Sequence, residues 1–246
     1  MLTDAWTVAW KEWRELLRIG GGRRGVIVRA LFSVGLLGVL WPWLIGAPFV
    51  DSGMPVLFAT MTAAMYVSAL VPDSFPGERE RHTLETLLAS RLPDSAILIG
   101  KIVALVVYAC GASVLMLISG WITVNLKVRG TLLTYDSGVL AAALVFAILT
   151  AGLVGAFGTL IALRATTVKQ AQQVLSTGLM LLLLAPAVIA EAWPTLWDRL
   201  IVVFSSSSGT DSGRLYTIGL GMVVAQIIFF GIAKQRFVRE RLVEEK

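Results

Sequence analysis

The chain has 246 residues, of which 57% are hydrophobic and 15% are charged, and its formal net charge is +5. This composition is too apolar for a soluble globular domain, so we expect a membrane protein in which helices satisfy the backbone polar groups. The net charge does not indicate nucleic acid as a partner, because the basic residues lie among acidic ones and anionic lipid headgroups also attract them.

The first predicted element is an amphipathic helix within residues 1–22. Trp6, Trp10 and Trp13 recur at helical spacing and form one apolar stripe. The charged residues of the opposite face are Lys11, Glu12, Arg14, Glu15 and Arg18. Indole rings favour the headgroup region, so we expect this interfacial helix to lie in the membrane plane. It is either a passive anchor or an elbow that moves with the first span.

Six later stretches are apolar and long enough to cross a bilayer, which takes roughly 20 helical residues. They cover residues 26–50, 54–71, 96–124, 138–163, 174–192 and 215–233. We therefore predict an all-α polytopic membrane protein, a single transmembrane domain over residues 1–246 with six transmembrane helices. Spans one and two, within 26–71, form a hairpin, and spans three to five fill 96–192.

Basic residues divide unevenly between the two sides of this arrangement. The side that holds both termini, including the tail 234–246, carries 17 of the 21 Lys and Arg residues. The other side carries Lys127, Arg129, Arg199 and Arg214. By the positive-inside rule, we expect both termini in the cytoplasm.

The triplet Asp-Ser-Gly precedes the second, fourth and sixth spans, at residues 51–53, 136–138 and 211–213. Asp and Ser accept hydrogen bonds from the free N–H groups at a helix start, so each triplet is expected to cap the span after it. The recurrence is either a coincidence of turn-prone composition or a trace of an ancestral hairpin repeat.

Residues 76–91, between the second and third spans, form a charged stretch that is too short to cross a membrane. Within it, residues 78–90 favour a helix with Leu84, Leu87 and Leu88 on one side. A helix of this length is marginal alone in water. We expect it to pack against the membrane surface, its own spans or the groove of a soluble partner.

This stretch resembles the corresponding loop of ABC-2-type (type V) ABC transporter permeases. The matching run is Glu-Arg-Glu-Arg-His-Thr-Leu-Glu-Thr-Leu-Leu-Ala-Ser at 78–90, followed by Gly100-Lys101 at the start of the third span. His82 stands where the family usually has Gly, which removes a flexible joint. The interfacial helix, the six spans and the shared side of the two termini extend the resemblance along the chain.

The resemblance implies that residues 76–91 form a cytoplasmic coupling helix that docks on a separate ATP-binding cassette ATPase. The expected docking residues are Glu78, Glu80, Arg81, His82, Thr83, Leu84, Glu85, Leu87 and Leu88. The chain has no phosphate loop, since Ser95 stands in place of its first glycine and Ile102 follows Lys101. We therefore expect no catalytic residue, metal or cofactor in this chain, with ATP and Mg bound by the partner ATPase.

The family also implies that two permeases pair, as a homodimer or with a related chain, in a plasma membrane of bacterial or archaeal type. Gly152, Gly155 and Gly158 of the fourth span form a small-residue face. Such a face suits either pairing between permeases or packing within one chain.

Residues 193–210 are apolar but too short to cross, so we expect short external or re-entrant helices there. Polar groups within spans are costly unless they face water or a partner. On these grounds the candidate pathway or gate residues are Ser113, Glu191, Trp197, Phe204 and Gln226.

The leading hypothesis is the permease of an exporter for a hydrophobic or amphiphilic substrate. A membrane scaffold that recruits an ATPase without transporting anything would share the coupling helix. An intramembrane enzyme is a third class, but a single histidine cannot form a His-Glu-x-x-His zinc site. The one cysteine, Cys110, is expected to be a small buried apolar residue.

Overall fold

The structure is a computed structural model of the whole chain, and it describes residues 2–16, 28, 31–32, 34–74, 76–81, 93–128, 130, 132–192, 194–195 and 212–236. Within these residues every regular element is a helix, which agrees with the predicted all-α class. Most of the predicted coupling helix and of the outer segment 193–210 lies outside them.

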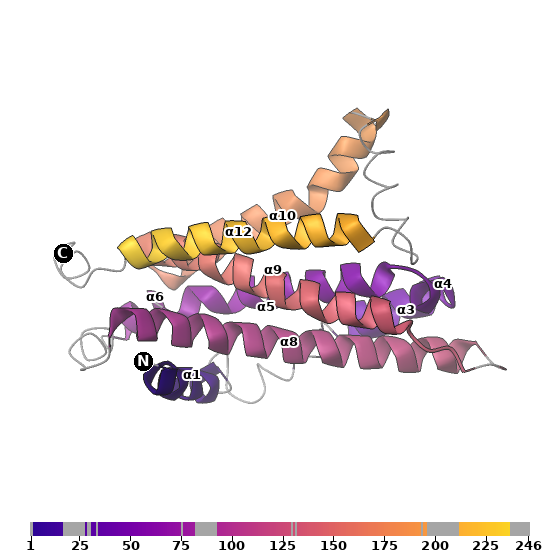
Figure 1. Cartoon of the computed structure of the whole chain (residues 1–246), viewed down its shortest axis with the longest axis horizontal. Helices are drawn as coiled ribbons and strands as arrows, with labels where there is room; N and C mark the ends of the chain where they lie inside the picture. The colour runs from indigo at the N-terminus through magenta and orange to yellow at the C-terminus, as the bar shows by residue number, and fades with distance from the viewer. Residues whose placement is uncertain are drawn as a thin grey trace.

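Four helices of the described part are long and apolar enough to cross a membrane. They are α5 (Met54–Ser74), α8 (Asp94–Lys127), α9 (Ser137–Arg164) and α12 (Ser212–Arg236). These helices run side by side along the molecule (Figure 1). They contain the residues predicted as the second, third, fourth and sixth spans, while the total of six spans stays a prediction.

The first predicted span, 26–50, is not one continuous helix. Its described part is π-helical over Val34–Leu40 (η1) and α-helical over Trp41–Ile45 (α3). Gly46 then ends the helix with a φ of 78°, in the left-handed region that favours glycine. A separate short helix, α4 (Pro48–Asp51), follows. The predicted continuation of the span to residue 50 is therefore wrong, because the chain turns at the glycine.

The centre of the bundle is α5, which contacts both α8 and α9. On α9, a Cβ added to Gly158 would lie 3.0 Å from Val71 of α5, and one added to Gly155 would lie 3.8 Å from Val67. Gly152 lies against the side chain of Gln226 on α12. These glycines let the helix backbones approach closely. Of the two roles that the sequence allowed for the small-residue face, packing within the chain is the one observed.

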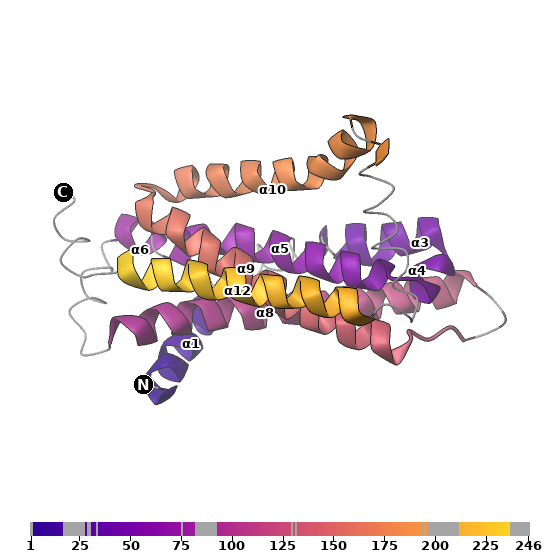
Figure 2. The ribbon, with the colours of Figure 1, turned by 45° about the horizontal axis from the view of Figure 1, so that its top comes forward.

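The helix α10 (Val168–Ala192) contains the residues of the predicted fifth span but leaves the bundle. It starts beside α9 and the short helix α6 (Pro76–Glu80) and rises away from them toward its C-terminal end (Figures 1 and 2). Large apolar side chains are exposed on α10 and α12, among them Met180, Leu181, Leu220, Ile227 and Ile228. Such surfaces suit contact with lipid tails or with another apolar protein surface.

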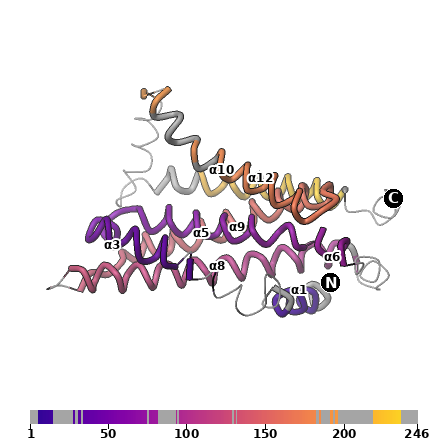
Figure 3. The backbone as a smooth tube through the Cα atoms, turned by 180° about the vertical axis from the view of Figure 1, so that it is seen from behind, coloured from indigo at the N-terminus to yellow at the C-terminus, as the bar shows by residue number. Residues whose placement is uncertain are grey.

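The N-terminal helix α1 (Leu2–Leu16) packs on α8, at the same end of the bundle as α6 (Figures 2 and 3). Its buried face consists of Val8, Ala9 and Glu12, whereas Trp6 and Trp10 are 65% and 51% exposed. The assignment of Glu12 to the outward polar face is therefore wrong. Glu12 follows Val8 by one helical turn and shares its inward side.

Trp13 also departs from the predicted stripe. Its ring centroid lies 5.9 Å from that of Tyr108 on α8, and the Tyr108 ring lies 5.6 Å from that of Tyr66 on α5. Tilted aromatic pairs at this distance are favourable beyond the area that they bury. A row of rings thus joins α1 to the two central helices.

At the opposite end of the bundle, the loop before α9 is bonded to α8. The side chain of Asn125 accepts from the N–H of Leu133 at 2.8 Å and donates to its carbonyl oxygen at 3.0 Å. Asp136 accepts from the N–H groups of Gly138 and Val139 in the first turn of α9, at 2.8 and 3.3 Å, which confirms the predicted cap there. In the first triplet the acceptor is Ser52 rather than the aspartate, and Asp211 of the third lies outside the described residues.

Candidate functional site

Three charged side chains are buried where α1, α6 and α8 meet. They are Glu12, Glu78 and Lys101, with exposed fractions of 6%, 5% and 2%. A buried charge is costly unless it is paired and hydrogen-bonded. The geometry among these groups therefore determines how the three helices are held together.

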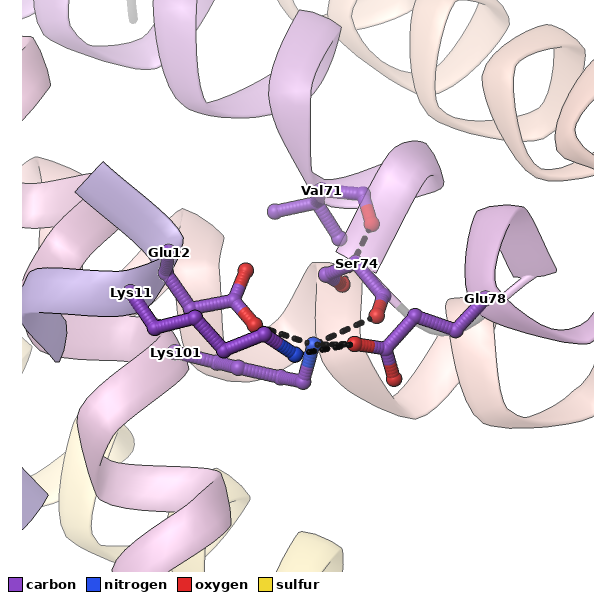
Figure 4. Close-up of polar contacts among 6 residues, drawn as sticks. All are labelled: Lys11, Glu12, Val71, Ser74, Glu78 and Lys101. Atoms are coloured by element: carbon purple, nitrogen blue, oxygen red, sulfur yellow. Dashed lines mark hydrogen bonds and ion pairs between the residues drawn. The ribbon is translucent and has the colours of Figure 1, made fainter. Parts of the chain in front are cut away.

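Lys101 bonds to three elements at once (Figure 4). Its Nζ donates to Glu12 Oε1 at 2.7 Å, to the carbonyl oxygen of Ser74 at 2.8 Å and to Glu78 Oε1 at 3.0 Å. Ser74 is the last residue of α5. An ammonium group has three donor protons, which these three acceptors match in number. One side chain on α8 thus holds α1, the end of α5 and α6.

Two of these acceptors, on Ser74 and Glu78, lie four residues apart in the chain. Ser74 donates from its hydroxyl to the carbonyl oxygen of Val71 at 2.6 Å, within the last turn of α5. Pro76 is the first residue of α6 that the structure describes. Glu78 consequently falls in the first turn of α6, beside the carbonyl end of α5.

The inner part of the site has two carboxylates for one ammonium. A second positive group, Lys11 of α1, lies at its half-exposed rim, with its Nζ 3.9 Å from Glu78 Oε1 (Figure 4). We call Lys11, Glu12, Glu78 and Lys101 the charge cluster. Removal of one inner member would leave an opposite charge buried without its partner, a change that typically costs about 3–5 kcal/mol.

The remaining charged residues of α6 bond to the opposite side of the bundle. Arg79 donates to the carbonyl oxygen of Ala165, just after the end of α9, at 3.2 Å. Glu80 Oε1 accepts from the N–H of Val168, the first residue of α10, at 2.7 Å. A cation at a helix C-terminus and a carboxylate at a helix N-terminus both oppose the helix dipole. The five-residue helix α6 is therefore bonded to α1, α8, α9 and α10.

Two of the predicted docking residues make bonds within the chain. Glu78 and Glu80 both use their carboxylates for bonds within the chain, and Arg81 is exposed directly after α6. The other six predicted docking residues lie outside the described part: His82, Thr83, Leu84, Glu85, Leu87 and Leu88. Docking on a partner stays a prediction for the whole set.

Sequence reasoning missed the roles of Glu12 and Lys101. One signal for Lys101 was present, because a lysine within an otherwise apolar helix needs a buried partner or a path to water. The identity of its partners was not readable, because Glu12 and Lys101 are 89 residues apart.

The predicted pathway residues do not gather in one place. The hydroxyl of Ser113 is buried and donates to the carbonyl oxygen of Ala59, which joins α8 to α5 at 3.0 Å. Gln226 packs on Gly152, and Glu191 is exposed near the end of α10. Trp197 and Phe204 lie outside the described residues. A metal site is not apparent either, since the described residues contain no cluster of three or more His, Cys, Asp or Glu side chains.

Comparison with known proteins adds one finding to this geometry. The model of a family described as ABC-2 type transporter matches residues 3–197. The matched range includes α1, α6 and α8 and therefore every member of the charge cluster. A comparison with curated proteins finds no match.

Proposed function

The chain belongs to the ABC-2 type transporter family, and from that membership we propose that it exports a hydrophobic or amphiphilic substrate, driven by a separate ATP-binding cassette subunit. It is a membrane-spanning permease subunit of an ABC transporter, a family whose membrane domain is not itself an ATPase. The partner binds ATP and Mg and hydrolyses the ATP, and the permease contributes the pathway.

The observation that carries this proposal is the set of bonds around α6. A permease without an ATPase motif needs a rigid connection between the site where the ATPase docks and the helices that must move. Residues 82–90 follow α6 directly, and α6 is bonded to α1 and α8 on one side and to the α9–α10 turn on the other. A displacement of residues 82–90 would therefore act on four helices together.

The buried polar residues of the central helices support an apolar or amphiphilic substrate. The hydroxyls of Thr62, Ser113 and Thr159 are all buried and donate to backbone carbonyl oxygens at 2.6–3.0 Å. Groups that are satisfied in this way are not available to bind a sugar or an ion. Recognition of the substrate then rests on apolar surface and on the pairing of two permeases, either two copies or one copy with a related chain.

The orientation that we propose places the end with α1, α6 and the C-terminal end of α12 in the cytoplasm (Figure 1). The excess of Lys and Arg on the side of both termini supports this orientation. It brings residues 82–90 to the side of the membrane where ATP is available.

Two single substitutions test the docking. Leu88→Asp removes an apolar contact, and Glu85→Arg reverses a charge, within the segment proposed to bind the ATPase. In membranes that contain the full chain and its ATP-binding cassette subunit, we expect each variant to insert normally but to retain little of the ATPase on affinity purification. The matched control is Leu132→Asp, which changes a residue that is 73% exposed at the opposite end of the bundle. If Leu88→Asp and Glu85→Arg both retain as much ATPase as the control, residues 82–90 do not have the proposed docking role.

A further inference from the structure

We propose that Lys101 is a positioning residue for transport. Through its bonds to Glu78 and Glu12, it transmits movement of residues 82–90 to the N-terminal helix α1. The proposal rests on the proposed function and adds a specific path for the movement. Lys101 contacts neither nucleotide nor substrate in this path, because it acts only on the position of α1 and α6.

Lys101 bonds directly to a carboxylate of α6 and to a carboxylate of α1. Glu78 belongs to α6, which leads directly into residues 82–90, and Glu12 belongs to α1. The same Lys101 Nζ joins the two carboxylates at 3.0 and 2.7 Å. Because the lysine is only 2% exposed, water cannot readily replace either carboxylate as its partner. A shift of Glu78 must therefore be followed by Lys101 or break a buried ion pair.

A buried ion pair at this position controls how the helices are placed relative to one another. Buried ion pairs often contribute no more stability than well-packed apolar residues of similar volume. Directional bonds, however, hold α1, α5 and α6 in one register, whereas apolar surfaces can slide over one another. The two carboxylates on Lys101 come from different helices, so its ammonium group links α6 directly to α1.

The opposite face of α1 lies outside the charge cluster. Trp6 and Trp10 are exposed, while Glu12 points into the cluster (Figure 4). Indole rings are favoured at the membrane interface. A pull on Glu12 would therefore displace tryptophans that lie in the headgroup region. The sequence left open whether α1 is a passive anchor or a moving elbow, and this connection favours the moving elbow.

The test follows α1 directly with an environment-sensitive fluorophore. Bimane is attached to Trp6→Cys in a Cys110→Ala background, and the full chain is reconstituted with its ATP-binding cassette subunit in lipid vesicles. The readout is the change in bimane emission when ATP and vanadate are added. Thermal unfolding of each complex in detergent is measured in parallel.

Three permeases are compared in this background. The first retains the cluster, and the second carries Thr123→Ala, which removes a buried hydroxyl of α8 that bonds the carbonyl oxygen of Gly38 but lies outside the cluster. The third combines Glu12→Gln, Glu78→Gln and Lys101→Met, which removes all inner charges together and leaves no buried ion unpaired. We expect the triple variant to bind the ATPase and to unfold within a few degrees of the intact cluster.

The intact cluster and the Thr123→Ala control should show the ATP-dependent change in emission, and the triple variant should lose it. A triple variant that binds the ATPase and keeps the full change would overturn the role of Lys101 while leaving the proposed function intact. Should the triple variant not fold, Lys101→Arg and Glu78→Asp are used in its place. In Glu78→Asp the carboxylate is drawn back by one methylene, and full retention of the change in bimane emission in this variant overturns the proposal. An intact chain that binds no ATP-binding cassette subunit would instead overturn the proposed function.

Discussion

Single side chains, or their absence, set the distances between helices in this bundle. At Gly158, α9 approaches α5 so closely that an added Cβ would lie 3.0–3.4 Å from three atoms of Val71. Val71 is completely buried and β-branched, so it has few alternative rotamers. At Gly111, on the exposed side of α8, an added Cβ would meet nothing within 4 Å. Two glycines in helices of similar length therefore have different roles.

Alanine should therefore have opposite effects on stability at the two glycines. Gly158→Ala should destabilise the protein by about 1–3 kcal/mol, because the extra methyl group overpacks the contact with Val71. Gly111→Ala should be neutral or stabilising by up to about 1 kcal/mol, because alanine is the better helix former. Thermal unfolding in a mild detergent measures both, and a melting temperature that falls as much for Gly111→Ala as for Gly158→Ala would contradict this explanation.

Among the elements, α6 depends most on its surroundings. Its sequence, Pro-Gly-Glu-Arg-Glu, combines two poor helix formers with three charged residues. Its three charged residues compensate by bonding to neighbouring helices: Glu78 in the charge cluster, Arg79 at the end of α9 and Glu80 at the start of α10. The helix α6, which precedes the proposed docking residues 82–90, is thus held by directional polar bonds on both sides.

The bond from Glu80 should protect the start of α10 from amide hydrogen exchange. Glu80→Ala removes the acceptor for the N–H of Val168, and a hydrogen bond of this kind contributes about 0.5–1.5 kcal/mol. We expect amide hydrogen exchange in a peptide that covers residues 165–171 to become about two- to tenfold faster. Arg81→Ala, at the next and exposed position, is the control and should leave exchange in this peptide unchanged. Equal exchange in the two variants would argue against a cap on α10.

At the scale of the whole molecule, the bundle has two chemically different ends (Figure 1). One end holds α1, α6 and the charge cluster. The other holds α3, α4 and the loop before α9, where Asn125 and Asp136 satisfy backbone groups and Lys127 donates to the carbonyl oxygen of Trp43. Between them the exposed faces are apolar, which suits a bilayer around the middle of the bundle.

The two ends should therefore react differently with a membrane-impermeant maleimide. In a Cys110→Ala background, Leu132→Cys should be labelled in intact cells, because it is 73% exposed at the end proposed to face outward. Arg81→Cys should be labelled only after the membrane is permeabilised. Labelling of Arg81→Cys from outside would reverse the proposed orientation and would also place residues 82–90 away from cytoplasmic ATP.

Much of the helical framework could be predicted from the sequence, because each long apolar stretch is a local property of the chain. Met54 was predicted as the start of the second span and is the first residue of α5, and the cap at Asp136 was recognised from its own triplet. The break at Gly46 was missed, because the apolar run on either side of that glycine continues and hydrophobicity alone does not show where a helix turns.

The family resemblance was also readable from local sequence, since the run at 78–90 is contiguous. The partners of the charged residues around that run, in contrast, depend on the tertiary structure. Glu12, Glu78 and Lys101 come from three helices, and whether such groups face water, lipid or one another depends on how α1 and α6 pack on α8. Sequence determined the helices because their periodicity is local, whereas the ion pairs between them depend on distances that only packing sets.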